Sequence, residues 1–230
     1  MKRKITIAID GFSSTGKSTI AKQLAKQLGY IYVDTGAMYR AVTLYAMQQN
    51  IIDEYHFDVD KLIANLDKIK LNFLYNEKLG FAEMFLNDKN VENEIRGMSV
   101  SKLVSKIATV SEVRKKLVSL QKKMGKDKGI VMDGRDIGTV VFKDAELKLF
   151  MTASPEKRAT RRYKELLDRG DDVSYEEILK NVQYRDHIDS TRKDSPLKKA
   201  KDAINFDNSS MGLEEQFERI YNFAKEIIEK

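Results

Sequence analysis

The sequence contains no cysteine and only two histidines among its 230 residues. A chain without cysteine forms no disulfide, no thiolate metal site and no cysteine nucleophile. His56 and His187 are also too few for a multi-histidine zinc site. Long apolar runs are missing as well, because only about five apolar residues separate the basic N-terminus from Asp10, too few for a signal-peptide core or a membrane span. We therefore expect a soluble protein of a reducing compartment, the cytoplasm, with no membrane partner.

The chain is basic, and its arginines are concentrated in one segment. The 41 basic residues outnumber the 35 acidic ones, and the net charge of +6 first suggests a polyanion partner such as nucleic acid. Acidic and basic residues are interspersed along the chain, but half of the twelve arginines fall within 35 residues. Arginine binds phosphate through paired N–H donors, so this concentration predicts a phosphate site rather than a surface for a polymer. The six arginines are Arg158, Arg161, Arg162, Arg169, Arg185 and Arg192.

Short apolar runs alternate with helical patterns along most of the chain. Five of them predict buried strands, at residues 5–9, 30–33, 130–133, 147–152 and 203–207. Helical patterns at 19–28, 37–49 and 213–228 lie between or after them. Continuous apolar strands separated by helices indicate an α/β doubly wound fold with a five-stranded parallel sheet and helices on both faces. We expect one domain over residues 1–230.

Residues 55–95 interrupt this alternation. Strand-like runs at 70–74 and 81–86 flank a loop that contains Gly80, and a second turn follows at 87–90. The pattern predicts a small β-insertion, after which helices between 98 and 125 return the chain to the core.

A P-loop pattern lies between the first predicted strand and the first predicted helix. Gly11, Gly16, Lys17 and Ser18 match Gly-x4-Gly-Lys-Ser. In such loops backbone N–H groups surround phosphate oxygens, the lysine reaches the β- and γ-phosphates, and the serine hydroxyl binds Mg²⁺. We predict a nucleoside triphosphate site formed by Gly11, Phe12, Ser13, Ser14, Thr15, Gly16, Lys17, Ser18 and Thr19.

Two apolar stripes continue into charged residues. The first has steps of 4, 3, 4 and 3 residues, which places its members on one helix face, and this face predicts a cleft wall. Its members are Ile178, Val182, Arg185, Asp189 and Arg192. The second runs from Leu103 to Leu117 and includes Arg114, provided that one helix continues through Ser111. Buried structural ion pairs are the alternative explanation for both stripes.

Two further segments place charge near predicted strand ends. Asp133-Gly-Arg-Asp136 ends a strand, where open α/β sheets bind ligands. Ser154-Pro-Glu begins a helix that carries Arg158, Arg161 and Arg162 at i, i+3 and i+4. Two arginine-bearing helices joined by a polar turn predict a mobile lid over phosphates at residues 154–174. A solvated basic helix face is the alternative.

Four segments together resemble the bacterial cytidylate kinases. They are Asp-Gly-x4-Gly-Lys-Ser-Thr from Asp10, Val33-Asp-Thr-Gly-Ala-Met-Tyr-Arg40, Asp133-Gly-Arg-Asp-Ile-Gly-Thr-Val140 and Arg185-Asp-x2-Asp-x2-Arg192. The resemblance implies a P-loop nucleoside monophosphate kinase fold with a helical lid and an enlarged nucleoside-monophosphate-binding insertion at 55–95. It also implies transfer of the γ-phosphate of ATP to CMP or dCMP, with Mg²⁺ bound through Ser18.

The resemblance further implies which residues bind CMP. Arg40, Arg135 and Arg192 would bind the phosphate, Arg185 and Asp189 the ribose with Thr35 close by, and Ser105, Arg114 and Asp136 the cytosine. A carboxylate accepts from the exocyclic amine of cytosine and repels the O4 atom of uracil, which supports the role of Asp136. Thr35 stands where many members have serine, so the preference between CMP and dCMP stays open, and Phe12 stands where proline is frequent.

The expected mechanism needs no general base, because the attacking phosphate oxygen is already anionic. Catalysis would consist of positioning and charge stabilisation by Lys17, Mg²⁺, Arg135 and Arg192, together with the lid arginines Arg158, Arg161 and Arg162. Two alternatives remain: another P-loop kinase, for UMP, AMP or a small metabolite, and a P-loop ATPase that acts on nucleic acid. We expect a monomer whose partners are small nucleotides and not nucleic acid.

Overall fold

The computed structural model describes residues 3–230, which divide into two compact units. The first unit comprises the chain up to Asp34 together with Gln121–Lys230, and the second comprises Thr35–Leu120.

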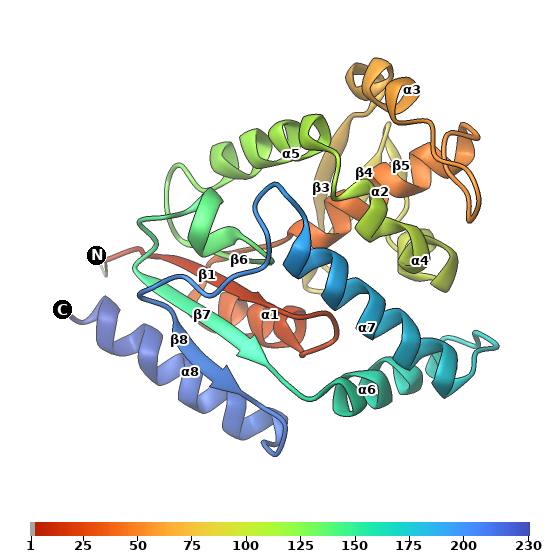
Figure 1. Ribbon diagram of the computed structural model, residues 1–230. Helices are drawn as coiled ribbons and strands as arrows, with labels where there is room; N and C mark the ends of the chain where they lie inside the picture. The colour runs from red at the N-terminus through yellow and green to blue at the C-terminus, as the bar shows by residue number, and fades with distance from the viewer. Residues whose placement is uncertain (1–2) are drawn as a thin grey trace. The chain divides into compact units, whose positions relative to one another are not determined.

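A five-stranded parallel sheet forms the centre of the first unit (Figure 1). Its strands are β1 (Thr6–Gly11), β2 (Ile31–Asp34), β6 (Ile130–Gly134), β7 (Leu147–Thr152) and β8 (Ile204–Asp207), in the order β2-β6-β1-β7-β8. All five predicted strands are confirmed, with ends that differ by one or two residues. Because β1 lies between β6 and β7, the segments that follow these three strands emerge at one edge of the sheet.

Helices α1 (Lys17–Leu28) and α8 (Leu213–Ile228) cover one face of this sheet. Alternate residues of β1, among them Ile7 and Ile9, pack there with Leu24 of α1 and Ile220 of α8, and all four are fully buried. The predicted packing of the C-terminal helix on the sheet is therefore confirmed. Ala8 and Asp10 alternate with these residues, so their side chains lie on the opposite face.

Two helices and one short turn complete the first unit. Helix α6 (Pro155–Asp168) packs against α7 (Tyr175–Thr191). The predicted start of α6 is confirmed, because Ser154 accepts a capping hydrogen bond from Lys157 N, and Ser174 accepts one from Glu177 N at the start of α7. The π-helical turn η3 (Ile137–Val141) follows β6 and was not predicted from the sequence.

The second unit contains the predicted β-insertion. Strands β3 (Leu71–Asn76), β4 (Phe81–Leu86) and β5 (Lys89–Asn90) form a small antiparallel sheet. The other elements are α2 (Thr35–Gln48), α3 (Val59–Ala64), η1 (Leu66–Lys68), η2 (Glu94–Arg96), α4 (Met98–Ile107) and most of α5 (Ser111–Met124), which continues into the first unit from Gln121.

The condition on the second stripe, that one helix continues through Ser111, is not met. Helix α4 ends at Ile107 and α5 begins at Ser111. Between them the Thr109 hydroxyl and backbone N–H both donate to the carbonyl of Lys106, at 2.7 and 3.2 Å. This local side-chain bond competes with the helical pattern and closes α4 with a tighter turn.

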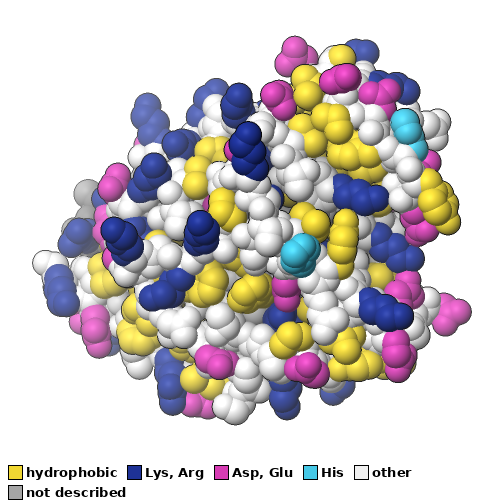
Figure 2. Space-filling model, in the orientation of Figure 1, with side chains coloured by type: hydrophobic (Ala, Val, Ile, Leu, Met, Phe, Trp, Pro, Cys, Tyr) yellow, Lys and Arg dark blue, Asp and Glu magenta, His cyan; other side chains and the backbone are white. Residues whose placement is uncertain are grey.

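The surface carries charges of both signs. Figure 2 shows Lys and Arg side chains interspersed with Asp and Glu over one face of the molecule. Among residues 3–230, none of the helices has the length and apolar character needed to span a membrane.

Gly11 is required where β1 passes into the following loop. Its φ is 150°, and a Cβ atom there would overlap the carbonyl oxygen of Met151 on the neighbouring strand β7. We predict that Gly11→Ala lowers the free energy of unfolding by about 2 kcal/mol or more, because the added methyl group must separate two paired strands.

Gly170→Ala is the matched control for this prediction. Gly170 also has a positive φ, 82°, but no described atom lies within 4 Å of an added Cβ. It should lose only about 1 kcal/mol, from backbone conformation alone. Chemical denaturation measures both variants, and equal losses would contradict the steric argument.

Candidate active site

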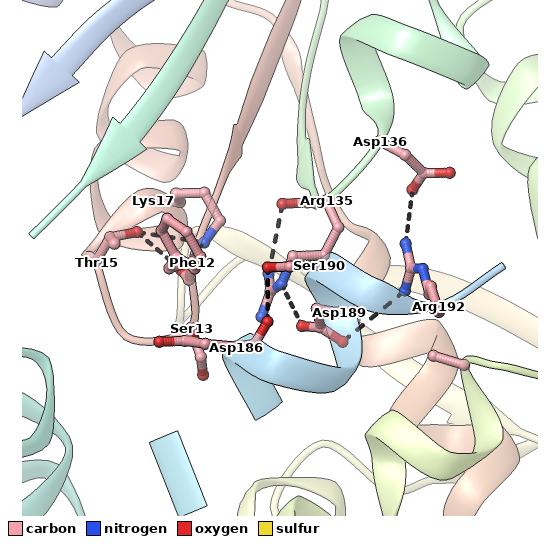
Figure 3. Close-up of polar contacts among 12 residues, drawn as sticks. Phe12, Ser13, Thr15, Lys17, Arg135, Asp136, Asp186, Asp189, Ser190 and Arg192 are labelled. Atoms are coloured by element: carbon pink, nitrogen blue, oxygen red, sulfur yellow. Dashed lines mark hydrogen bonds and ion pairs between the residues drawn. The ribbon is translucent and has the colours of Figure 1, made fainter. Parts of the chain in front are cut away.

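The segment between β1 and α1 has the shape of a phosphate-binding loop. Ser14 and Gly16 have positive φ values of 59° and 90°, and Gly16, which has no side chain, is the N-cap of α1. Lys17 is buried, and its Nζ donates to the carbonyl of Phe12 at 2.6 Å and to Thr15 Oγ1 at 3.3 Å (Figure 3). The helix N-terminus and the lysine together place positive charge around the loop.

The ammonium group of Lys17 is strongly desolvated. Burial, and then the positive charge of Arg135, lower the pKa of Lys17 to about 7, although Asp133 and Asp10 oppose the change. A phosphate group beside the ammonium would favour its charged form and raise this pKa again. The loop is therefore expected to take up a proton when it binds a polyphosphate above neutral pH.

Asp133 lies at the end of β6, beside the loop. Its Oδ1 accepts from the Tyr32 hydroxyl at 2.8 Å, and its Oδ2 accepts from Ser18 Oγ at 3.0 Å. Burial, and then Asp34, raise the pKa of Asp133 to about 6, although Lys17 and the two hydroxyl donors oppose the rise. A hydroxyl and a carboxylate next to a phosphate site form an oxygen donor set that suits Mg²⁺ with phosphate and water ligands.

A charged cluster joins the turn after β6 to α7 (Figure 3). Arg135 Nε donates to Asp189 Oδ2 at 2.8 Å, and Arg192 lies 3.9 Å from both Asp189 Oδ1 and Asp136 Oδ1. Burial alone would raise the pKa of Asp189, but Arg135, Arg185 and Arg192 outweigh it and hold the pKa below its usual value. Three guanidinium groups around one carboxylate make the cluster positive, as a phosphate site requires.

The predicted stripe on α7 lies on one buried face, and its role as a cleft wall stays a prediction. Ile178, Val182, Arg185 and Asp189 are all buried, and Arg192 is buried one residue beyond the end of the helix. Burial, and then Arg135, lower the pKa of Arg185 to about 10. The guanidinium of Arg192 donates twice to the carbonyl of Ser195, at 3.0 and 2.7 Å, which fixes its orientation.

Arg158 connects α6 to α7 and to the phosphate-binding loop. It is only 2% exposed, and it donates to Asp186 through both Nη atoms, at 3.0 and 2.6 Å. It also donates to the carbonyls of Ala153 and Ser13, at 2.9 and 3.2 Å, and its guanidinium lies 5.2 Å from the centre of the Phe12 ring. The solvated-face alternative is therefore wrong for this residue.

Arg161 and Arg162 make contacts different from those of Arg158. Arg161 donates to the carbonyl of Thr15 at 3.1 Å and to Asn208, which itself donates to the same carbonyl at 2.7 Å. Arg162 is buried and donates to Glu165 at 2.5 Å. Arg158 and Arg161 thus both contact the loop backbone, and Arg162 contacts a residue of its own helix.

The remaining predicted residues lie in the second unit, and all four are buried. Thr35 and Arg40 belong to α2, and Arg40 donates to the carbonyl of Ile95 at 3.2 Å. Ser105 lies on α4 and Arg114 on α5. The guanidinium of Arg114 lies 5.6 Å from the centre of the Tyr39 ring, a cation–π contact that orients it.

Sequence reasoning missed three polar residues of the first unit. Asp133 belongs to a charged motif that the sequence showed, but no role was predicted for it. Asn208 follows a predicted strand, and a polar residue at the carboxyl end of a parallel strand is a signal for ligand binding. Asp186 adjoins Arg185 in the sequence, but nothing local identifies it as the partner of Arg158.

Comparison with known proteins identifies the family. A family model described as cytidylate kinase matches residues 7–226, nearly the whole chain. The chain belongs to the cytidylate kinase family.

The cytidylate kinase of Flavobacterium psychrophilum is 63% identical over 225 residues, which cover 98% of this chain and 100% of that protein. That of Flavobacterium johnsoniae is 61% identical over 226 residues, which cover 98% of each. That of Parabacteroides distasonis is 58% identical over 214 residues, which cover 93% of each.

A solved structure shares the fold but little of the sequence. A gluconokinase from Sinorhizobium meliloti 1021 matches with a TM-score of 0.50 and 11% identity, over 100% of this chain and 96% of that one. The sequence resemblance to the cytidylate kinases is thus confirmed at the level of the family, and the predicted α/β kinase fold is confirmed as well.

Because the pKa of Lys17 is lowered, we predict that this cytidylate kinase family member takes up a proton when it binds ATP. At pH 8 the free protein should hold Lys17 largely neutral, since its pKa is about 7, and ATP should restore the charge. Binding at pH 8 should therefore take up close to one proton per site. Isothermal titration of ATP in two buffers of different ionisation enthalpy measures this uptake.

Lys17→Arg is the control, because arginine stays protonated in both states. Its binding should show no proton uptake. Equal uptake by the variant and the natural protein, or none by either, would contradict the assignment to Lys17.

Proposed function

We propose that this chain transfers the γ-phosphate of ATP to CMP or dCMP, giving ADP and CDP or dCDP. The observation that carries the proposal is the family match over residues 7–226, which includes the phosphate-binding loop and the Asp133–Asp136 turn. The geometry supports it, because β1 and β6 are paired in parallel and deliver these two segments to the same edge of the sheet.

The donor nucleotide is assigned to the loop after β1. Its phosphates would lie among the backbone N–H groups of the loop, with Lys17 between the β- and γ-phosphates. The complete set is Gly11, Phe12, Ser13, Ser14, Thr15, Gly16, Lys17, Ser18 and Thr19. Mg²⁺ would be held through Ser18, with Asp133 orienting the hydroxyl, and when bound it would neutralise charge on the phosphates.

The acceptor nucleotide is assigned to the residues that the family resemblance implies. Arg40, Arg135 and Arg192 would bind its phosphate, Arg185, Asp189 and Thr35 its ribose, and Ser105, Arg114 and Asp136 its base. Four of these arginines are less than 10% exposed, at 9% for Arg40, 3% for Arg114, and 7% for both Arg185 and Arg192. Arginine donates to phosphate and carboxylate oxygens through paired N–H groups, which supports the assignment of these residues to an anionic ligand.

Catalysis in this proposal consists of positioning and charge stabilisation. The nucleophile is a phosphate oxygen of CMP, so the chain has no proton to remove. Lys17, Arg135 and Arg192 would stabilise the charge on the transferred group, with Arg158, Arg161 and Arg162 adding positive charge from the lid. Contacts of Arg158 and Arg161 with the carbonyls of Ser13 and Thr15 support a role beside the loop. Closure of residues 154–174 would keep water from the reacting phosphate.

We further propose a monomeric enzyme of the cytoplasm whose partners are nucleotides rather than nucleic acid. On the face that Figure 2 shows, the interspersed charges support the choice of nucleotides over nucleic acid, because a polymer-binding face would carry charge of mainly one sign.

The direct test is a coupled assay of ADP release with Mg²⁺-ATP and a panel of acceptors: CMP, dCMP, UMP, AMP and single-stranded nucleic acid. We expect CMP or dCMP to give the highest kcat/KM. Fastest turnover with UMP or AMP would identify a different nucleoside monophosphate kinase. ATP hydrolysis stimulated by nucleic acid and suppressed by salt would identify the ATPase alternative. Lys17→Ala should be inactive throughout and controls for contaminating kinases.

Asp136→Asn gives a prediction about base specificity. An amide can donate to the O4 atom of uracil, whereas the carboxylate repels it. We predict that the CMP/UMP ratio of kcat/KM falls by about tenfold or more, as expected for one misdirected base contact of 1–3 kcal/mol. The measurement is the ratio in the same assay, and an unchanged ratio would remove Asp136 from the base site.

A further inference from the structure

The carboxylate of Asp10 binds the backbone that follows the Asp133–Asp136 turn. Asp10 is 4% exposed, its Oδ1 accepts from Ile137 N at 2.7 Å and its Oδ2 accepts from Gly138 N at 2.8 Å. These are the first two residues of η3, so a residue of β1 caps a helical turn that lies 127 residues later in the chain. Burial raises the pKa of Asp10 to about 7, whereas the two N–H donors and Lys17 oppose the rise.

Asp10 is also tied to the other end of the same turn. In the parallel pairing of β1 and β6 its register partner is Gly134, the last residue of β6. Arg135 and Asp136 therefore lie between two anchor points, the strand pairing before them and the carboxylate bonds after them. Both anchors belong to Asp10, which itself immediately precedes Gly11 of the phosphate-binding loop.

Two different aspartates cap η3 and contact Arg192. Asp136 occupies the N-cap position of η3, where an aspartate commonly accepts hydrogen bonds from the first turn of its own helix. Here the capping acceptor is Asp10, and Asp136 Oδ1 lies instead 3.9 Å from Arg192 Nη2. Capping by Asp10 thus allows the Asp136 carboxylate to point toward Arg192.

The close approach of Asp10 to η3 depends on Gly138. A Cβ atom at this position would lie 3.3 Å from Asp10 Oδ2 and 3.2 Å from Lys148 Cδ. The glycine therefore gives the carboxylate room to meet the N–H group of residue 138. Both residues suit this contact, because Asp10 supplies a buried carboxylate and Gly138 has no side chain to obstruct it.

We propose that Asp10 is a positioning residue for the pair Arg135 and Asp136, and that it sustains the discrimination of cytosine from uracil by capping η3. The inference rests on the proposed function of these two residues. An Asp10→Asn side chain keeps its volume but presents one acceptor and one donor to two N–H groups, so one hydrogen bond is replaced by a repulsive contact. The turn should then shift while the sheet remains paired.

Asp10→Asn should lower the CMP/UMP ratio of kcat/KM by about tenfold and raise KM for CMP more than KM for ATP. The matched control is Glu146→Gln, which also converts a carboxylate to an amide. Glu146 accepts from Thr6 N at 2.9 Å, at the opposite end of β1, and its side chain is 12% exposed. This control should leave the ratio unchanged. A ratio measures the active molecules only, so partial unfolding of a variant does not affect it.

A double-mutant cycle tests whether Asp10 acts through Asp136. If it does, Asp10→Asn should change the CMP/UMP ratio in the natural background but by less than twofold in the Asp136→Asn background. Equal effects in both backgrounds, or an unchanged ratio in the single variant, would overturn the proposal.

Hydrogen exchange supplies a readout that does not depend on the assigned roles. At least one of the two amides, of Ile137 or Gly138, should exchange at least tenfold faster in Asp10→Asn than in Glu146→Gln, because the asparagine amide keeps only one acceptor. If the exchange rates are equal, the capping role of Asp10 is refuted. If Asp136→Asn alone leaves the CMP/UMP ratio unchanged, the base-reading role of Asp136 fails, and the exchange rates and the KM for CMP still decide on Asp10.

Discussion

Buried guanidinium groups determine how the first unit of this cytidylate kinase family member is built. A charge taken out of water destabilises the fold by several kcal/mol unless a partner of opposite charge lies close to it. The structure satisfies this constraint with aspartates of α7: Asp186 binds Arg158 through two hydrogen bonds, and Asp189 lies against Arg135 and Arg192. The helix therefore serves as the anionic framework on which the positive site is assembled.

The parallel sheet makes this assembly possible. Because β1 is paired with both β6 and β7, the phosphate-binding loop and the Asp133–Asp136 turn emerge side by side. Two buried carboxylates then connect the segments: Asp133 accepts from Ser18 of the loop helix, and Asp10 accepts from the backbone after the turn. Each lies where a strand ends, and each contacts a neighbouring segment rather than its own. The positions of Arg135 and Asp136 thus follow from strand order together with these two contacts.

The features that the sequence predicted correctly have local signals. The P-loop spacing, the five apolar strands and the 4-3-4-3 stripe of α7 depend on residues a few positions apart, and the family resemblance added the roles. The features that it missed depend on distant pairs. Asp10 caps η3 across 127 residues, and Arg158 meets Asp186 across 28, and neither spacing leaves a periodic pattern. The position of the break between α4 and α5 has another cause, because the Thr109 hydroxyl binds the carbonyl of Lys106 although the apolar period continues past it.

We propose that Asp189 holds Arg135 and Arg192 in place for an anionic substrate. The test compares the free energy of unfolding of the natural protein and Asp189→Asn, in chloride buffer and with added inorganic phosphate. We expect a loss of about 3 kcal/mol in chloride, because Arg135 and Arg192 lose their shared carboxylate. We also expect phosphate to stabilise the variant more than the natural protein, because the anion replaces that carboxylate. An unaltered stability in chloride, or equal stabilisation of both proteins by phosphate, would contradict it.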